Sequence, residues 1–64
     1  MTDRTAYIYA AALAGDLDYA EVRTSDDAVW AANGYRERAE DESLPLDERR
    51  FAYDFVANLD CDFG

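Results

Sequence analysis

The side chains of this chain that could do chemistry are almost all acidic. Fifteen aspartates and glutamates stand against six arginines, with no lysine and no histidine, and the formal charge is −9. Five tyrosines and one cysteine complete the titratable groups. The lack of imidazole and amine side chains excludes histidine bases, Schiff-base lysines and histidine metal ligands. Only chemistry performed by carboxylates remains to be weighed.

Two carboxylate sites can be tested against the sequence. Asp16 and Asp18, with Asp27 eleven residues after Asp16, partly match a calcium-binding loop. Such a loop needs an oxygen ligand at its fifth position and glycine at its sixth, where this chain has Ala20 and Glu21. Paired carboxylates also cleave glycosides, but so small a fold offers no cleft deep enough to raise the pKa of one of them. We therefore expect no catalytic residue, no metal site and no cofactor, and hence not an enzyme.

We interpret the acidic residues instead as a surface that binds another protein. Carboxylates three or four residues apart on a helix lie about 5–6 Å from one another, and DNA presents one charge per roughly 3.4 Å along each strand. A helix carrying Asp26, Glu37 and Glu40 could therefore imitate a row of phosphates. The residues predicted to bind a protein partner are Asp16, Asp18, Asp26, Trp30, Glu37, Glu40, Asp41, Glu42, Asp47 and Asp54.

The acidic composition also has two interpretations that involve no partner. The charge could simply keep a small protein in solution, with Arg36, Arg38, Arg49 and Arg50 paired to neighbouring acids. It could also reflect adaptation to salt, because aspartate outnumbers glutamate ten to five, arginine replaces lysine entirely and the isoelectric point is about 4.1. Both interpretations stay open at the level of the sequence.

Trp30 has two interpretations as well. Tryptophan is enriched at binding hot spots, and Trp30 falls among the acidic positions of its predicted helix, where it could dock into a basic cleft. In so small a chain it could equally be a core or boundary residue, and burial is favoured.

The first half of the chain predicts either two helical pieces or a hairpin. Residues 2–14 are rich in alanine and end at Gly15, which suits the left-handed end of a helix. A short piece over residues 17–23, capped by Asp16, would follow. Residues 5–9 also favour a strand, so a β-hairpin within residues 5–24 is the alternative; the alanines favour the helix.

The second half predicts two longer helices. Thr24 and Ser25 are N-cap residues, and a helix from Asp26 to about Glu40 follows. It would bury the stripe formed by Ala28, Ala31, Ala32, Tyr35 and Ala39, with a kink or close packing at Gly34.

The last helix is expected from Pro45 to Asp60. Residues 60–62 are expected to fray. The expected core face is Phe51, Ala52, Phe55, Val56 and Leu59, with Asp47, Arg50 and Asp54 facing outwards.

These elements predict one mainly α-helical domain over residues 1–64, a small bundle of three to four short helices. The alternative is an N-terminal β-hairpin followed by two helices, an α+β fold. Cys61 is alone, which favours a reducing cytoplasm, and the apolar run over residues 6–14 is too short to span a membrane. A monomer is expected, with dimerisation as the alternative.

Such a chain should be repelled by nucleic acid and anionic lipid and attracted to basic, nucleic-acid-binding protein surfaces. In length, composition and charge it resembles the small acidic inhibitors of phages and mobile elements, the DNA-mimic anti-CRISPR and antirestriction proteins. A second similarity, to antirestriction proteins alone, lies in Tyr7 to Ala10 and residues 59–64, although the present chain is much shorter. In those proteins the early segment is a strand.

The resemblance implies an anti-CRISPR type of inhibitor that blocks a basic nucleic-acid-binding protein or complex, such as a CRISPR effector, in the host cytoplasm. The alternative function is a small antitoxin or regulatory module that binds its partner through apolar helix faces.

Overall fold

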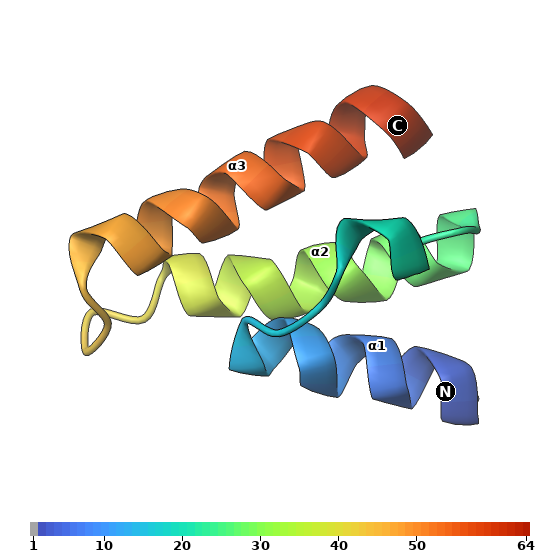
Figure 1. Ribbon diagram of the computed structural model, residues 1–64, viewed down its shortest axis with the longest axis horizontal. Helices are drawn as coiled ribbons and strands as arrows, with labels where there is room; N and C mark the ends of the chain where they lie inside the picture. The colour runs from blue at the N-terminus through green and yellow to red at the C-terminus, as the bar shows by residue number, and fades with distance from the viewer. Residues whose placement is uncertain (1) are drawn as a thin grey trace.

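Helices make up most of the structure, a computed structural model that describes residues 2–64. In chain order they are α1 (Asp3–Ala14), a short 3₁₀-helix η1 (Tyr19–Glu21), α2 (Ser25–Ala39) and α3 (Leu46–Phe63). The α2 helix lies between α1 and α3 and packs against both (Figure 1). No strand occurs within residues 2–64. The predicted helical bundle is therefore confirmed, and the hairpin alternative is wrong.

The direction of the helices is set by the segment that joins α1 to α2. Figure 1 shows α1 and α2 running the same way, with α3 running back against α2. The segment over residues 15–24, which we call the crossover, returns along the bundle and passes over α2. It is tied down where Tyr35 Oη donates a hydrogen bond to the Leu17 carbonyl at 3.3 Å.

Both ends of α1 follow from its sequence. Thr2 is the N-cap, and its side chain and that of Thr5 each accept from the other's backbone N–H. At the other end Gly15 adopts φ 73°, the left-handed region, and its N–H reaches the carbonyls of Ala11 and Ala12. The crossover differs from expectation, because Asp18, and not Asp16, caps a helix of only three residues.

The α2 helix begins at Ser25, one residue before its predicted start, with Thr24 Oγ1 accepting from the Asp27 N–H at 3.1 Å. Its predicted alanine and Tyr35 stripe is buried throughout. Of the two alternatives predicted at Gly34, a kink or close packing, the structure shows close packing: a Cβ added there would lie 2.5 Å from Ala12 Cβ and 3.0 Å from the Tyr9 carbonyl oxygen. The missing side chain thus lets α1 and α2 approach closely.

The α3 helix is longer than predicted, and fewer of its apolar side chains are buried than expected. It continues to Phe63, so residues 60–62, which were expected to fray, are helical. Ala52, Phe55 and Leu59 are buried as expected, but Phe51 is 56% exposed and Val56 is only partly buried. Since α2 is the helix that packs along α3, only a narrow i, i+3, i+7 line is covered. No helix within residues 2–64 is long and apolar enough to cross a lipid bilayer.

Candidate protein-binding face

An exposed aromatic ring surrounded by carboxylates is the most distinctive surface of the molecule. Phe51 lines two neighbouring hollows, one beside Asp18 and Asp54, the other beside Asp47 and Glu48. The crossover supplies Asp18, whereas α3 supplies the other groups. We call this surface the Phe51 face; it consists of Asp18, Tyr19, Asp47, Phe51 and Asp54.

The Phe51 ring is held by buried aromatic side chains. Tyr35 stacks on Phe55 with ring centroids 4.0 Å apart, and the Phe51 and Tyr35 rings make a T-shaped contact with centroids 6.2 Å apart. The Phe51 and Phe55 centroids are 6.3 Å apart. The Phe51 ring is therefore held against the core while more than half of the residue stays accessible. Aromatic groups presented in this way are favourable binding anchors because little side-chain entropy is lost on contact.

Tyr19 fastens the crossover to α3. Its ring packs on Phe55 at 5.2 Å, and its hydroxyl donates to the Asn58 carbonyl at 2.9 Å and to the Asp62 carboxylate. The hydrogen bond to Asp62 is the main cause that raises the pKa of Tyr19 to about 12. These contacts hold Asp18 beside α3.

The carboxylates of the Phe51 face are oriented by local structure. Asp18 accepts from the Ala20 N–H at 3.0 Å and so caps η1. Asp47 and Asp54 are exposed and seven residues apart, which places them on the same side of α3 about 10 Å apart along its axis. Arg38 lines the hollow beside Asp47, but it is paired with Glu48 at 3.5 Å and donates to the Leu13 carbonyl.

The predicted acidic row along α2 is interrupted. Asp26 and Glu37 in α2, and Glu40 at its C-cap, are exposed, as predicted. However, Asp26 and Glu37 are separated by about 16 Å of helix, with Asn33 between them on that side. The Glu37 carboxylate also accepts a hydrogen bond from Tyr9, which is the main cause of the raised pKa of that tyrosine.

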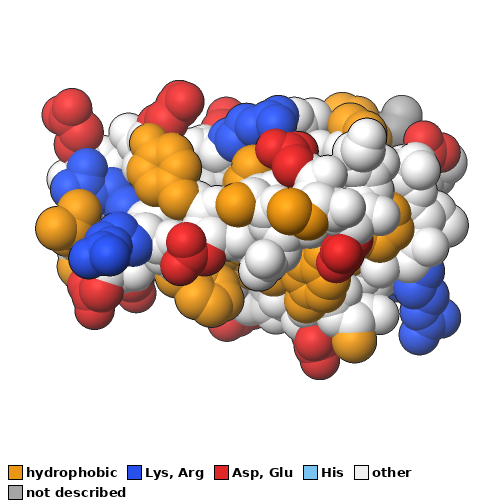
Figure 2. Space-filling view, turned by 90° about the horizontal axis from the view of Figure 1, so that it is seen from above, with side chains coloured by type: hydrophobic (Ala, Val, Ile, Leu, Met, Phe, Trp, Pro, Cys, Tyr) orange, Lys and Arg blue, Asp and Glu red, His pale blue; other side chains and the backbone are white. Residues whose placement is uncertain are grey.

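The acidic cluster after α2 is mixed with positive charge. Residues 36–50 hold six carboxylates but also four of the six arginines. Asp41 accepts two hydrogen bonds from Ser43, which lower its pKa. Seen over α3, acidic and basic side chains alternate with apolar ones instead of forming a single acidic row (Figure 2). This end of the molecule is therefore less phosphate-like than its acid count implied.

Trp30 lies between its two predicted environments. It is partly buried, packs against the core, and stands edge-on to Tyr9 with centroids 5.6 Å apart. It also lines a shallow hollow with Asn33, Glu37 and Glu40. Trp30 is thus a boundary residue between the core and the surface.

The structure divides the predicted binding residues into groups. Asp18, Asp47 and Asp54 meet at the Phe51 face, and Asp16 is exposed on the crossover two residues before Asp18. The rest lie elsewhere: Trp30, Glu37 and Glu40 border one hollow, Asp41 and Glu42 lie in the α2–α3 loop, and Asp26 stands at the start of α2.

Two residues of the Phe51 face are absent from the predicted set. Tyr19 and Phe51 are large aromatic residues, and residue type alone predicts a place in the core for both. One signal in the sequence could have identified Phe51. The predicted apolar face of α3 is wider than a single neighbouring helix can cover, so some of its residues must stay exposed.

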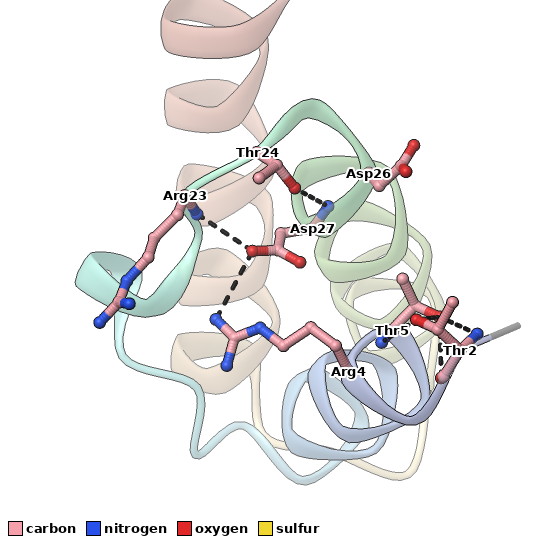
Figure 3. A pocket seen from close by; sticks show the side chains of 7 residues that line it. All are labelled: Thr2, Arg4, Thr5, Arg23, Thr24, Asp26 and Asp27. Carbon is pink, nitrogen blue, oxygen red and sulfur yellow. Dashed lines mark hydrogen bonds and ion pairs between the residues drawn. The ribbon is translucent and has the colours of Figure 1, made fainter.

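A polar hollow at the starts of α1 and α2 has a structural role (Figure 3). Asp27 is only 4% exposed and accepts from Arg4 at 3.5 Å and from the Arg23 N–H at 3.2 Å. Arg4 also donates to the Glu21 carbonyl. The side chain of Asp27 therefore joins the two helix starts to the crossover, whereas Asp26 points away from them.

Within residues 2–64, no group of three or more acidic or cysteine side chains is arranged to hold a metal ion. Comparison with family models, with curated proteins and with solved structures finds no match to this chain.

Proposed function

We propose that this protein is a non-enzymatic inhibitor that uses the Phe51 face to bind a cationic surface of another protein. In its specific form the proposal is a DNA mimic of the anti-CRISPR type, acting in the host cytoplasm on a bacterial defence complex such as a CRISPR effector. Occupation of the basic nucleic-acid-binding surface by carboxylates would exclude the nucleic acid both sterically and electrostatically.

The observation that carries the proposal is that three exposed carboxylates without an arginine partner lie close to the exposed Phe51 ring. In residues 2–64 the ion pairs are Arg4 with Asp27 and Arg38 with Glu48. Asp18, Asp47 and Asp54 are therefore available to a partner's arginines and lysines. The remaining negative charge would steer a basic surface towards this face and accelerate the encounter, in a manner that salt weakens.

The test compares two charge-neutralising triple variants after capture of a partner from bacterial lysate. Asp18→Asn, Asp47→Asn and Asp54→Asn remove three charges from the Phe51 face, and asparagine retains the helix cap at position 18. At about 0.5 kcal/mol for each exposed pair, the triple variant should bind about tenfold more weakly.

The matched control carries Glu37→Gln, Glu40→Gln and Glu42→Gln. It changes the net charge by the same three units as the first triple variant, but at acidic residues outside the Phe51 face. It should retain most of the affinity, and DNA should compete with the unmodified protein for the captured partner. Equal losses in both triple variants, or affinity that does not change with salt, would contradict the proposal.

A second candidate function rests on exposed apolar side chains. Val29, Leu46 and Tyr53 are each more than half exposed in addition to Phe51. An antitoxin-like or regulatory module would use them to pack against a partner helix. Its complex would be insensitive to salt and would be weakened by Val29→Ser or Tyr53→Ser more than by either triple variant.

A further inference from the structure

The hollow between the crossover and α3 has an apolar floor and an acidic rim. Leu17 and Phe55 are 5% and 6% exposed and form the floor together with the accessible Phe51 ring. Tyr19 and Asn58 line its side. The Tyr19 hydroxyl is occupied by its hydrogen bonds to Asn58 and Asp62, so this residue presents an apolar ring to an occupant.

The rim carries charge of one sign. Asp18 and Asp54 line the hollow, and no arginine does. They come from different elements, the crossover and α3, so an occupant lying between them meets a carboxylate from each. An apolar floor bordered by carboxylates is complementary to an apolar side chain bordered by guanidinium groups.

We infer that this hollow binds one apolar side chain of a partner segment whose neighbouring residues are arginines. The inference rests on the proposed function, and it adds the recognition element that the partner must carry. A guanidinium can make two parallel hydrogen bonds with Asp18 or Asp54, and it can also pack on the exposed part of the Phe51 ring. Lysine would supply the charge without the paired geometry.

Charge also argues against a second copy of this chain as the occupant. A twofold contact through this face would place the same surface patch on both sides. Asp18 and Asp54 would then face carboxylates, between molecules that each carry a formal charge of −9. An arginine-flanked segment removes this repulsion.

The experiment titrates the ¹⁵N-labelled 64-residue chain with two synthetic peptides and follows backbone amide shifts by NMR. The first peptide is a leucine with two arginines on each side, and the second has serine in place of the leucine. The leucine peptide should shift the amides of Leu17, Asp18, Asp54 and Asn58, and it should bind at least about threefold more tightly than the serine peptide because its leucine is removed from water.

Two substitutions locate the effect. Phe51→Ser should abolish the preference for leucine, with an unchanged far-UV circular dichroism spectrum as the check on folding. Val29→Ser is the matched control, because Val29 is 55% exposed and does not line this hollow, and it should keep the preference.

Equal affinity for the two peptides, binding by neither, or shifts spread over α1 would each overturn the inference. Concentration-dependent shifts of these amides without peptide would also overturn it, since they would identify a second copy as the occupant. None of these results bears on the lysate-captured partner. The proposed function fails separately, if the Asp18, Asp47 and Asp54 triple variant still binds that partner with full affinity.

Discussion

Replacing Gly34 with alanine tests the close approach of α1 and α2. The new methyl group would lie 2.5 Å from Ala12 Cβ and 3.0 Å from the Tyr9 carbonyl oxygen. Neither neighbour is a flexible side chain, so the two helices must separate. Overpacking of this kind costs about 1–3 kcal/mol, and the upper part of that range applies here. Alanine returns about 1 kcal/mol through its helix propensity. We expect a net loss of about 1–2 kcal/mol.

The assay is urea unfolding followed by far-UV circular dichroism. A domain of this size has a stability of only a few kcal/mol, so the midpoint should move clearly to lower urea. Asn33→Ala is the control, because Asn33 is the adjacent residue on the outer side of α2 and the substitution raises helix propensity without entering the contact. It should be neutral or slightly stabilising.

Combining Gly34→Ala with Ala12→Gly removes the closest of the two contacts. The double variant should be less destabilised than the sum of the two single variants, as expected for residues in direct contact. A Gly34→Ala protein as stable as the unmodified one would refute the inferred packing of α1 on α2.

Three further predictions concern charge and titration. Asp27→Asn should lower the free energy of unfolding by about 1–3 kcal/mol in urea melts, because it weakens a buried acceptor shared by Arg4 and the Arg23 N–H; an unchanged midpoint would contradict that role. Tyrosine absorbance should show one group of the folded protein ionising near pH 12, and this group should be absent in Tyr19→Phe. The free energy of unfolding should fall as the pH rises from about 10 to 12, because the folded pKa of Tyr19 lies above its unfolded value of 10.0. The far-UV spectrum should be the same in dilute buffer and in molar salt, whereas a chain adapted to salt would unfold in the dilute buffer.

Local signals in the sequence predicted the fold well. Gly15 ended α1 and Thr24 began α2, because each provides a backbone conformation or a hydrogen bond that a helix end requires. The helical spacing of the alanines before and after Tyr35 identified the buried side of α2. Gly34 was recognised as a point of either a kink or close packing, since glycine within a helix is otherwise unfavourable.

The candidate face was harder to predict because it depends on contacts between distant segments. Phe51 belongs to the core by residue type, and only the narrow cover provided by α2 leaves it exposed. Asp18 and Asp54 are 36 residues apart in sequence and line one hollow only because the crossover is fastened to α3 by Tyr19. The arginines mixed into the acidic cluster over residues 36–50 were visible in the sequence, but their effect on the surface was underestimated.

The parallel arrangement of α1 and α2 has a consequence for any attempt to shorten the protein. The pair formed by α2 and α3 is a simple helical hairpin and would carry Asp47, Phe51 and Asp54 by itself. Asp18 and Tyr19 belong to the crossover, which joins the end of α1 to the start of α2 (Figure 1). A fragment beginning at Ser25 would thus keep three of the five residues of the Phe51 face and lose Asp18 and Tyr19, so the face is complete only when the segment before α2 is present.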